Sequence, residues 1–398
     1  AEMFIDPLTG LCDPRPEDCP PGHIPIFSEG CKSLAIPGCV DEFMNPETGL
    51  CDPSPEDCPP GYIPIFDEGC RAVGVSGCHA SFVDPETGLC IPNPDDCDPG
   101  MAVVPTGGCR SLDPAAGCGE GTWGEVEALD GDVHVDPSYG GDDSDGSRDK
   151  PWTLTGYALG DVQEGGRVVL AAGEYDTGII LTKSVGLVGR CASMVSLTGV
   201  RSGDYGATVL EAKGAVEVTI SDVRVSGAGF GVIIHGGATA NLSRVRIEGN
   251  QGLGLVVSDE GTTATVTDVL IEATGAMNDG SFGMGAQVSS GATMNLSVGA
   301  IIGNRQTGIV AADPGTVAHV EDVLVARTTS LSNGLNGEGV QVTGGAQLTL
   351  TDVVISENRD EGLLLGDEGT LVPSEFFEKK IRPVLIEHCY ECHSGESI

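Results

Sequence analysis

Residues 387–398 read EHCYECHSGESI and place Cys389, Cys392 and His393 in the spacing Cys-x-x-Cys-His. Two thiols at this spacing can add to the vinyl groups of a haem, and the adjacent imidazole can ligate the iron, as in c-type haem attachment. A disulfide oxidoreductase would need a thioredoxin-like βαβ setting, which the sequence lacks. A zinc site would need four tetrahedral ligands, and the span from His388 to His393 is too short to supply them easily. We therefore predict that Cys389 and Cys392 bind haem c covalently and that His393 ligates its iron.

A second candidate site is acidic. Asp142, Asp143 and Asp145 lie together in the stretch GGDDSDGSRD. Carboxylate oxygens are the ligands that calcium prefers, but this stretch lacks the full D-x-D-x-D-G-x5-E spacing of a calcium loop. Two hypotheses remain open here, a calcium site and an Asp/Gly turn that caps the segment after it.

The segment that leads into the haem motif has helical spacing of its apolar residues, although Pro383 predicts a kink. The sequence PSEFFEKKIRPVLIEHCYECHSGES resembles the beginning of the cytochrome c domain of planctomycete-type multidomain proteins. The resemblance implies that Cys389 and Cys392 are the attachment points and His393 the proximal ligand. Such domains usually continue and supply a distal Met, whereas five residues follow His393 here. A truncated chain and a remnant segment are both open interpretations.

Twelve of the 15 cysteines lie before residue 119, in three copies of one unit. The copies contain FIDPLTGLC, FMNPETGLC and FVDPETGLC, so that Cys12, Cys51 and Cys90 are 39 residues apart. A fixed period indicates an array whose units contact mainly their neighbours. Each unit has too few apolar residues for a core, so disulfides must cross-link it, and its four cysteines allow three pairings. We expect Cys191, outside the array, to be a buried small apolar residue.

Composition limits the classes of function. The chain has 59 acidic and 20 basic residues and a net charge of -39, which excludes a sequence-independent nucleic-acid binder and argues against docking on an anionic membrane. Its 60 glycines disfavour a mainly helical fold, and no apolar run is long enough to cross a bilayer. The clustered cysteines indicate an oxidising compartment. We predict an exported bacterial protein, extracellular or at the cell surface, with the periplasm as the alternative.

From about residue 125 to 370 the chain falls into coils of similar sequence. The segments from TISDVRVSG to TLTDVVISENR align at Val223, Val245, Val269, Ala300, Val323 and Val353. Steps of 22 to 24 residues suit one turn of a right-handed parallel β-helix, with Val, Ile, Leu and Ala inside and Gly at the corners. Asn250, Asn304 and Asn358 follow the same strand in alternate coils, and because Asn tolerates the left-handed region and can bond to stacked neighbours, they predict a turn ladder.

The two coils that lack this Asn carry insertions, GAMNDGSFGMG at 275–285 and TSLSNGLNGEG at 329–339. These insertions should leave the same edge of the solenoid two rungs apart, which separates them by about 10 Å. Binding in solenoids commonly resides in such lateral loops. We predict that they form a ligand-facing surface, with flexible decoration as the alternative.

The coils resemble the pectate-lyase-like right-handed β-helix proteins, on the coil pattern and on VDPSYGGDDSDGSRDKPW followed by VVLAAGEY. The resemblance implies the fold, and many relatives bind or cleave acidic polysaccharides. A glycosidase needs two convergent carboxylates. Asp222, Asp268, Asp322 and Asp352 instead recur at one register position, which predicts a turn-facing ladder rather than an active-site pair. We therefore predict no catalytic residues.

The sequence thus predicts an all-β protein with three parts: tandem four-cysteine repeats (1–119), a right-handed parallel β-helix (125–370) and a truncated cytochrome c-like segment (371–398). The leading hypothesis is an exported binding or scaffold protein, with a surface polysaccharide or a protein as its ligand, no nucleic-acid partner and no membrane span. The alternatives are a haem-binding electron-transfer protein that uses the β-helix as a display stalk, and a polysaccharide-active β-helix enzyme.

Overall fold

A computed structural model of the chain describes residues 23–26, 30–33, 40, 43, 57–59, 62–65, 69–72, 77–85, 88–176, 178–199, 208–366 and 369–371. The chain forms two compact units, one made of Ala1–Gly74 and Val83–Leu89, the other of Val75–Phe82 and Cys90–Ile398. The predicted domain boundaries remain predictions. The predicted helical haem segment lies outside the described residues.

The described residues of the first unit include two antiparallel hairpins, one from each of two cysteine repeats. Strand β1 (His23–Ile26) pairs with β2 (Gly30–Ser33), and β3 (Tyr62–Ile65) pairs with β4 (Gly69–Ala72). Cys58, which precedes the second hairpin, forms a disulfide with Cys70 of β4. Each cysteine repeat has too few apolar residues for a core, so a hairpin cross-linked at its second strand is the structure that the repeat can support.

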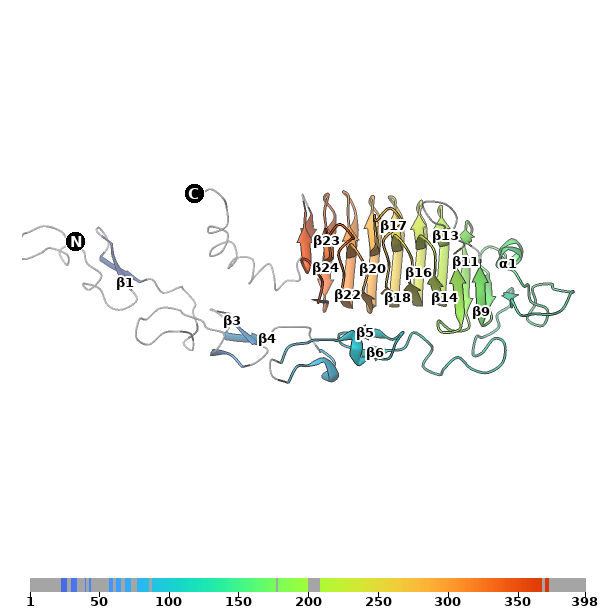
Figure 1. The fold of residues 1–398 in the computed structure, drawn as a ribbon, viewed down its shortest axis with the longest axis horizontal. Helices are drawn as coiled ribbons and strands as arrows, with labels where there is room; N and C mark the ends of the chain where they lie inside the picture. The colour runs from blue at the N-terminus through green and yellow to red at the C-terminus, as the bar shows by residue number, and fades with distance from the viewer. Residues whose placement is uncertain are drawn as a thin grey trace, which may run out of the picture. The chain divides into compact units, whose positions relative to one another are not determined.

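The second unit is a parallel β-helix whose coils alternate between two sheets (Figure 1). Within the described residues the first sheet has eight parallel strands: β10 (Ile179–Leu181), β13 (Thr208–Lys213), β15 (Phe230–His235), β17 (Leu253–Ser258), β19 (Met284–Ser289), β21 (Thr307–Ala311), β23 (Glu338–Val342) and β26 (Leu363–Leu365). Each strand pairs with its equivalent one coil later, so the predicted coil repeat is confirmed.

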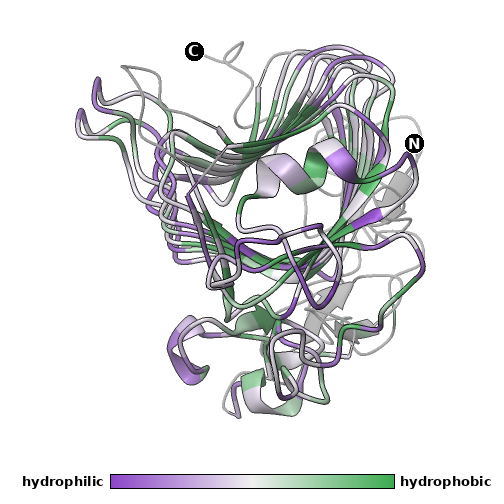
Figure 2. Ribbon diagram, turned by 90° about the vertical axis from the view of Figure 1, so that its right-hand side faces the viewer, coloured by the Kyte–Doolittle hydropathy of each residue, from purple (hydrophilic) through white to green (hydrophobic). Residues whose placement is uncertain are grey.

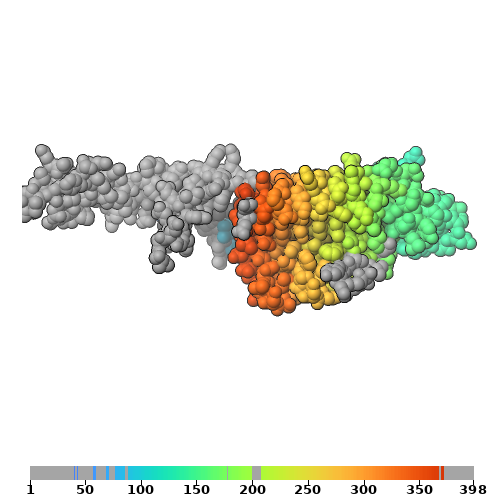
Figure 3. Space-filling view, turned by 90° about the horizontal axis from the view of Figure 1, so that it is seen from above, coloured from blue at the N-terminus to red at the C-terminus, as the bar shows by residue number. Residues whose placement is uncertain are grey.

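The second sheet has thirteen strands in the described residues. They are β7 (Val133–Val135), β8 (Arg167–Leu170), β9 (Gly173–Asp176), β11 (Val185–Gly189), β12 (Val195–Thr198), β14 (Glu217–Ser226), β16 (Thr239–Glu248), β18 (Thr263–Glu272), β20 (Thr293–Ile302), β22 (Val317–Ala326), β24 (Gln347–Thr351), β25 (Val354–Ser356) and β27 (Thr370–Leu371). Figure 2 looks along the stack and shows the coils superposed in one common outline. Figure 3 shows the same coils following one another in chain order as a continuous surface.

The core of the β-helix is a stack of aliphatic side chains between the two sheets. Along β14, for example, Val218, Ile220, Val223 and Val225 are buried, and the register places Val245 and Val269 on the rungs after Val223. The helix α1 (Thr155–Asp161) covers the N-terminal end, where Ala158 joins this core. No helix in the described part of the chain has the length and apolar content to span a membrane.

The predicted alignment was wrong at one coil, because Gly299 and not Ala300 pairs with Val269 and Val323. A side chain is excluded at this position, since a Cβ on Gly299 would lie 2.5 Å from the Val269 carbonyl oxygen. The steps between aligned residues are therefore 22, 24, 30, 24 and 30, which reveals a repeat of two coils and 54 residues.

The predicted Asn ladder is confirmed in its hydrogen bonds. Asn304 is fully buried, its Oδ1 accepts from Thr274 N (3.0 Å) and its Nδ2 donates to Ile271 O (3.5 Å) in the preceding coil. Asn250 and Asn358 make the equivalent bonds. The expected left-handed conformation, however, falls on the residue that precedes each Asn or its equivalent: Gly227, Gly249, Ala273, Gly303, Arg327 and Glu357.

The third cysteine repeat packs against the outside of the larger sheet. Its elements are 3-10 turns at Ala80–Phe82 and Pro94–Asp96 and the hairpin of β5 (Ala102–Val104) and β6 (Gly108–Arg110). We call residues 90–127 the strap. Its apolar residues Val103 and Leu112 join a cluster with Leu270 and Leu324 of the β-helix, so this repeat, unlike a free array unit, shares a core with the solenoid.

The disulfides correct two expectations. Cys97–Cys109 joins the second and third cysteines of a repeat, but Cys78–Cys90 joins the last cysteine of one repeat to the first of the next. The structural unit is therefore displaced from the sequence unit. Cys191 is not a free apolar residue, because it forms a disulfide with Cys118 that fastens the strap to the β-helix.

Candidate binding surface at the paired edge loops

The two predicted insertions form matching loops on one edge of the β-helix. Residues 273–283 connect β18 to β19 and residues 327–337 connect β22 to β23, whereas only residues 303–306 make the same connection in the coil between them. We call 273–283 and 327–337 the edge loops. In the view along the stack, loops leave the common outline on one side (Figure 2).

The edge loops have the same backbone conformation despite different sequences. Met277 N donates to Ser281 O (2.8 Å), and Leu331 N donates to Leu335 O (3.0 Å) at the equivalent place. The two tip glycines, Gly280 and Gly334, have φ of 83° and 81°. The residues two positions later, Phe282 and Asn336, also match, with φ of 61° and 64°. A left-handed conformation is rare for a bulky residue such as Phe. The backbone of the loop, and not the preference of the residue, therefore sets the conformation at Phe282.

The short turn between the two loops holds them together. Arg305 N donates to Thr274 O (3.0 Å), and Arg305 NH1 donates to Ser330 O (3.5 Å), so one residue bonds to both loops. A Cβ on Gly283 would lie 2.6 Å from the Arg305 Cβ, and a Cβ on Gly280 would lie 3.4 Å from Ser332 Oγ. The loops therefore lie side by side, as predicted from their two-rung separation.

The loop surface combines apolar and cationic groups. Phe282 is 38% exposed and Leu335 is 63% exposed. Arg305 and Arg359, which stand one two-coil repeat apart, are exposed and have no carboxylate partner among the described residues. Two such guanidinium groups beside exposed apolar side chains form a local surface that can donate hydrogen bonds to an amphipathic ligand.

Three carboxylates lie beside the second edge loop. Glu338, Asp360 and Glu361 each offer an oxygen, and these oxygens lie within 4.8 Å of one another. Glu338 is buried, and its orientation is fixed because Oε2 accepts from Gly337 N (3.2 Å) and Thr307 Oγ1 (3.3 Å). This donor set suits a hard cation such as calcium.

The predicted acidic cluster lies elsewhere, in an exposed turn before the first coils. Asp143 pairs with Lys150 (2.6 Å) and accepts from Tyr139 OH (2.9 Å), and these partners lower the pKa of its carboxyl. Asp145 accepts from Ser147 N (3.0 Å). Asp142 is exposed on the same turn. A calcium ion there would compete with Lys150 for Asp143. The predicted haem residues Cys389, Cys392 and His393 lie outside the described residues.

The recurrent aspartates hold structure together. Asp222, Asp268, Asp322 and Asp352 have φ between 51° and 60°, so each occupies a left-handed corner of the larger sheet. Asp222 binds Arg244 of the next coil through two bonds of 2.6 and 2.7 Å. Asp268 pairs with Arg110, and Asp322 accepts from Thr106 N, so these two hold the strap. The carboxylates of Asp222, Asp268 and Asp322 are thus engaged in coil and strap contacts.

Residues 205–376 match the family model described as a right handed beta helix region, which is less than half of the chain. The handedness of the described coils follows from this match. No curated protein matches the chain in sequence.

Similar solved structures include three enzymes. A pectate lyase has 17% identity and a TM-score of 0.49, over 58% of this chain and 64% of its own, so the chain spans less than two thirds of that enzyme's length. A pectin methylesterase from Aspergillus niger has 13% identity and a TM-score of 0.38, over 63% and 87%. An alginate lyase from a Paenibacillus species has 17% identity and a TM-score of 0.35, over 50% and 71%.

Proposed function

We propose that this protein is an exported binding and display protein whose ligand-facing surface is formed by the paired edge loops. The observation that supports the proposal most is that two insertions of different sequence share one backbone conformation, one two-coil repeat apart. Flexible decoration would not need the same turn twice. The disulfides support export, because they persist in oxidising compartments.

The chemistry of the edge loops favours a surface polysaccharide or an extended protein segment as the ligand. Such a ligand can contact both loops at once, and two contacts within one molecule raise the affinity above that of either loop alone. The exposed Phe282 and Leu335 supply apolar contact, and Arg305 supplies a cation between the loops.

The proposal is tested by replacing both edge loops with the short turn at residues 303–306 of the same chain. The probe is an array of bacterial surface polysaccharides together with an extracellular-matrix protein panel. We expect the native chain to bind at least one probe and the short-turn variant to lose that binding by at least tenfold. Equal binding by the variant would remove the edge loops from the proposal. A smaller change, Phe282→Ser with Leu335→Ser, should weaken binding, whereas Ile180→Ser, at an apolar residue exposed away from the loops, should not.

The Cys-x-x-Cys-His motif supports a second function, in which the C-terminal segment carries a c-type haem for electron transfer. Cys389 and Cys392 would hold the group covalently, and His393 would ligate its iron, which supplies one-electron redox chemistry. A pyridine haemochrome spectrum of protein made with a c-type maturation system tests this. Covalent haem in the native chain and none in Cys389→Ala/Cys392→Ala would support it, and no covalent haem in the native chain would refute it.

A further inference from the structure

A row of polar side chains runs along the outside of the larger sheet. The strand register aligns one outward position in six successive coils, and the residues there are Thr219, Asn241, Thr265, Asn295, His319 and Thr349. We call these six residues the polar row. The side chains on either side of each point into the core, as Leu242 and Ala240 do beside Asn241. Successive strands lie about 4.8 Å apart, so the row has the spacing of the coils.

The polar row is open to ligand. Thr219, Asn241 and Thr265 are exposed, and no hydrogen bond joins any of the six side chains to another described residue. The rows beside it are also rich in hydroxyls, with Thr239 and Ser243 flanking Asn241, and Thr263 and Thr267 flanking Thr265. From β16 to β20 this surface carries no charged residue up to the left-handed corner, although the chain as a whole has a net charge of -39. Threonine and asparagine side chains both donate and accept hydrogen bonds.

The polar row begins inside a cleft. A hollow of about 730 Å³ lies between the strap and the larger sheet, and Thr219 and Asn241 line it together with Pro114 and Glu127 of the strap. A second hollow of about 650 Å³ continues under the strap, and it shares Pro114 and Arg244 with the first. The roof is fixed by the Cys118–Cys191 disulfide.

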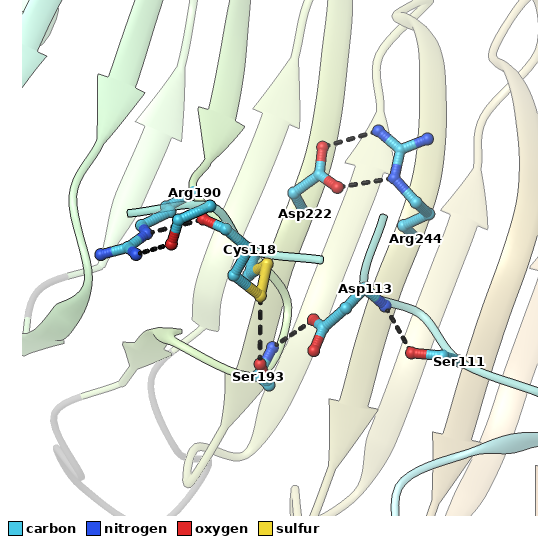
Figure 4. Close-up of a disulfide and its surroundings, with 9 residues drawn as sticks. Ser111, Asp113, Cys118, Arg190, Ser193, Asp222 and Arg244 are labelled. Carbon is cyan, nitrogen blue, oxygen red and sulfur yellow. Dashed lines mark hydrogen bonds and ion pairs between the residues drawn. A yellow bond between two sulfur atoms is a disulfide. The ribbon is translucent and has the colours of Figure 1, made fainter. Parts of the chain in front are cut away.

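Two of the arginines that line the cleft are paired with carboxylates. Arg244 binds Asp222 through two bonds, and Arg167 binds Asp132 through two bonds of 2.9 and 2.7 Å. Arg190 donates to the backbone oxygens of Cys118 (3.0 Å) and Gly119 (Figure 4). Glu125, Glu127 and Glu217 also line the cleft, so the positive and negative side chains around it nearly balance.

We propose that the cleft and the polar row together bind a linear neutral polysaccharide, laid along the solenoid axis with one end under the strap. Sugar hydroxyls donate and accept in the same way as the Thr and Asn side chains. An acidic polymer would be repelled by the charge of the chain. This site lies on the outer face of the larger sheet, whereas β19 belongs to the eight-stranded sheet. The site does not depend on the edge loops.

The proposal makes a prediction about chain length. Among the described residues, neither the row nor the lining of the cleft includes Phe, Tyr or Trp, so recognition rests on hydrogen bonds distributed over several coils. Each such bond contributes about 1 kcal/mol, or roughly fivefold in affinity. Affinity should therefore rise with each added sugar until the oligosaccharide spans the row.

The test uses neutral glucan and mannan oligosaccharides of graded length, with oligogalacturonate as the acidic comparison, in calorimetric titrations of the full chain. We expect affinity for at least one neutral series to increase with length and oligogalacturonate to bind more weakly. The double variant Asn241→Ala/Thr265→Ala should lose roughly 25-fold in affinity. A matched control, Gln287→Ala at an outward position of the other sheet, should bind like the native chain.

Three outcomes would overturn the proposal: no binding of either neutral series, affinity that does not depend on length, or equal binding by the double variant. Both substituted side chains are exposed, and the urea midpoint of each variant verifies that it remains folded. The chain with short turns in place of both edge loops should keep this binding, so a failure here is distinguishable from a failure of the edge-loop proposal.

Discussion

At the residue scale, the left-handed residues that precede each ladder asparagine, or its threonine equivalent, repeat one conformation with different side chains. Ala273, Arg327 and Glu357 have φ of 54° to 59°, and Gly303 has φ of 63° at the equivalent place. A side chain in this left-handed region costs about 1 kcal/mol relative to glycine. Arg327 uses its position, because its guanidinium binds Asp95 of the strap through two bonds of 2.8 Å and Glu357 at 2.7 Å.

The methyl group of Ala273 cannot make bonds like those of Arg327. Ala273→Gly should therefore raise the free energy of unfolding by up to about 1 kcal/mol. The reverse change, Gly303→Ala, should lower it by a similar amount, since open space surrounds a Cβ there and only the backbone resists. Urea unfolding of both variants measures the two effects. Destabilisation by Ala273→Gly would contradict the assignment of a strained alanine.

His134 predicts a dependence of stability on pH. It is 4% exposed, neither ring nitrogen has a partner among the described residues, and it packs edge-on against Trp123 at 4.7 Å between ring centroids. Burial lowers the pKa of His134 below its ordinary value, and Asp132 opposes this. The folded chain therefore resists protonation, and the unfolded chain takes up the proton first as the pH falls.

The stability contributed by neutral His134 is thus complete above its unfolded pKa of about 6.5 and is lost progressively below it. The loss of stability between pH 7 and pH 5 should be smaller in His134→Gln, which cannot titrate. Comparing the two slopes cancels the contribution of the many carboxylates. Identical slopes would mean that His134 becomes protonated without cost in the folded chain.

At the element scale, each inserted coil is tied to the next coil by an asparagine, Asn304 for the first and the half-buried Asn358 for the second. Asn304→Ala would leave Thr274 N and Ile271 O without their bonds. We expect a loss of about 2–3 kcal/mol in the free energy of unfolding. Asn278→Ala, an exposed asparagine in the first edge loop, should change it by less than about 0.5 kcal/mol. Equal effects would show that the asparagine bonds are not what holds the inserted coils.

The coil repeat, the two edge loops and the ladder of asparagines could be predicted from sequence, because each depends on local periodicity. The docked strap could not, because the hairpin sequence recurs in three copies that look equivalent. One difference between the copies does distinguish the third repeat. The first two copies read IPIFSEG and IPIFDEG, whereas the third reads AVVPTGG. Thr106 stands where the second copy has the acidic Asp67, whose carboxylate would repel Asp322. The Thr106 hydroxyl instead donates a hydrogen bond to Asp322 Oδ2.

At the scale of the whole molecule, the Cys118–Cys191 disulfide joins two segments 73 residues apart and fastens the strap over the cleft. This disulfide could not be predicted from units of four cysteines. Cys78 pairs with Cys90 across a repeat boundary, and the same shift leaves Cys118 to pair outside the array. The polar row could not be predicted from the sequence for another reason. Its residues are ordinary surface types, and only the register of six strands aligns them.

Removing this disulfide should destabilise the second unit. The double variant Cys118→Ser/Cys191→Ser reopens a long loop, and we expect a loss of about 4 kcal/mol together with proteolytic cleavage between residues 110 and 130. Limited proteolysis with mass spectrometry measures the second effect. An uncut strap in the double variant would show that Arg110, Thr106 and Arg327 hold it without the disulfide.

Hydrogen exchange, measured by mass spectrometry on the native chain with and without the array probe that it binds, shows whether the two edge loops bind one ligand together. If they do, exchange should slow in residues 273–283 and in residues 327–337 at the same probe concentration, with little change in the outward strands of the same coils. Protection of only one edge loop, or protection confined to other parts of the chain, would contradict joint binding by the two loops.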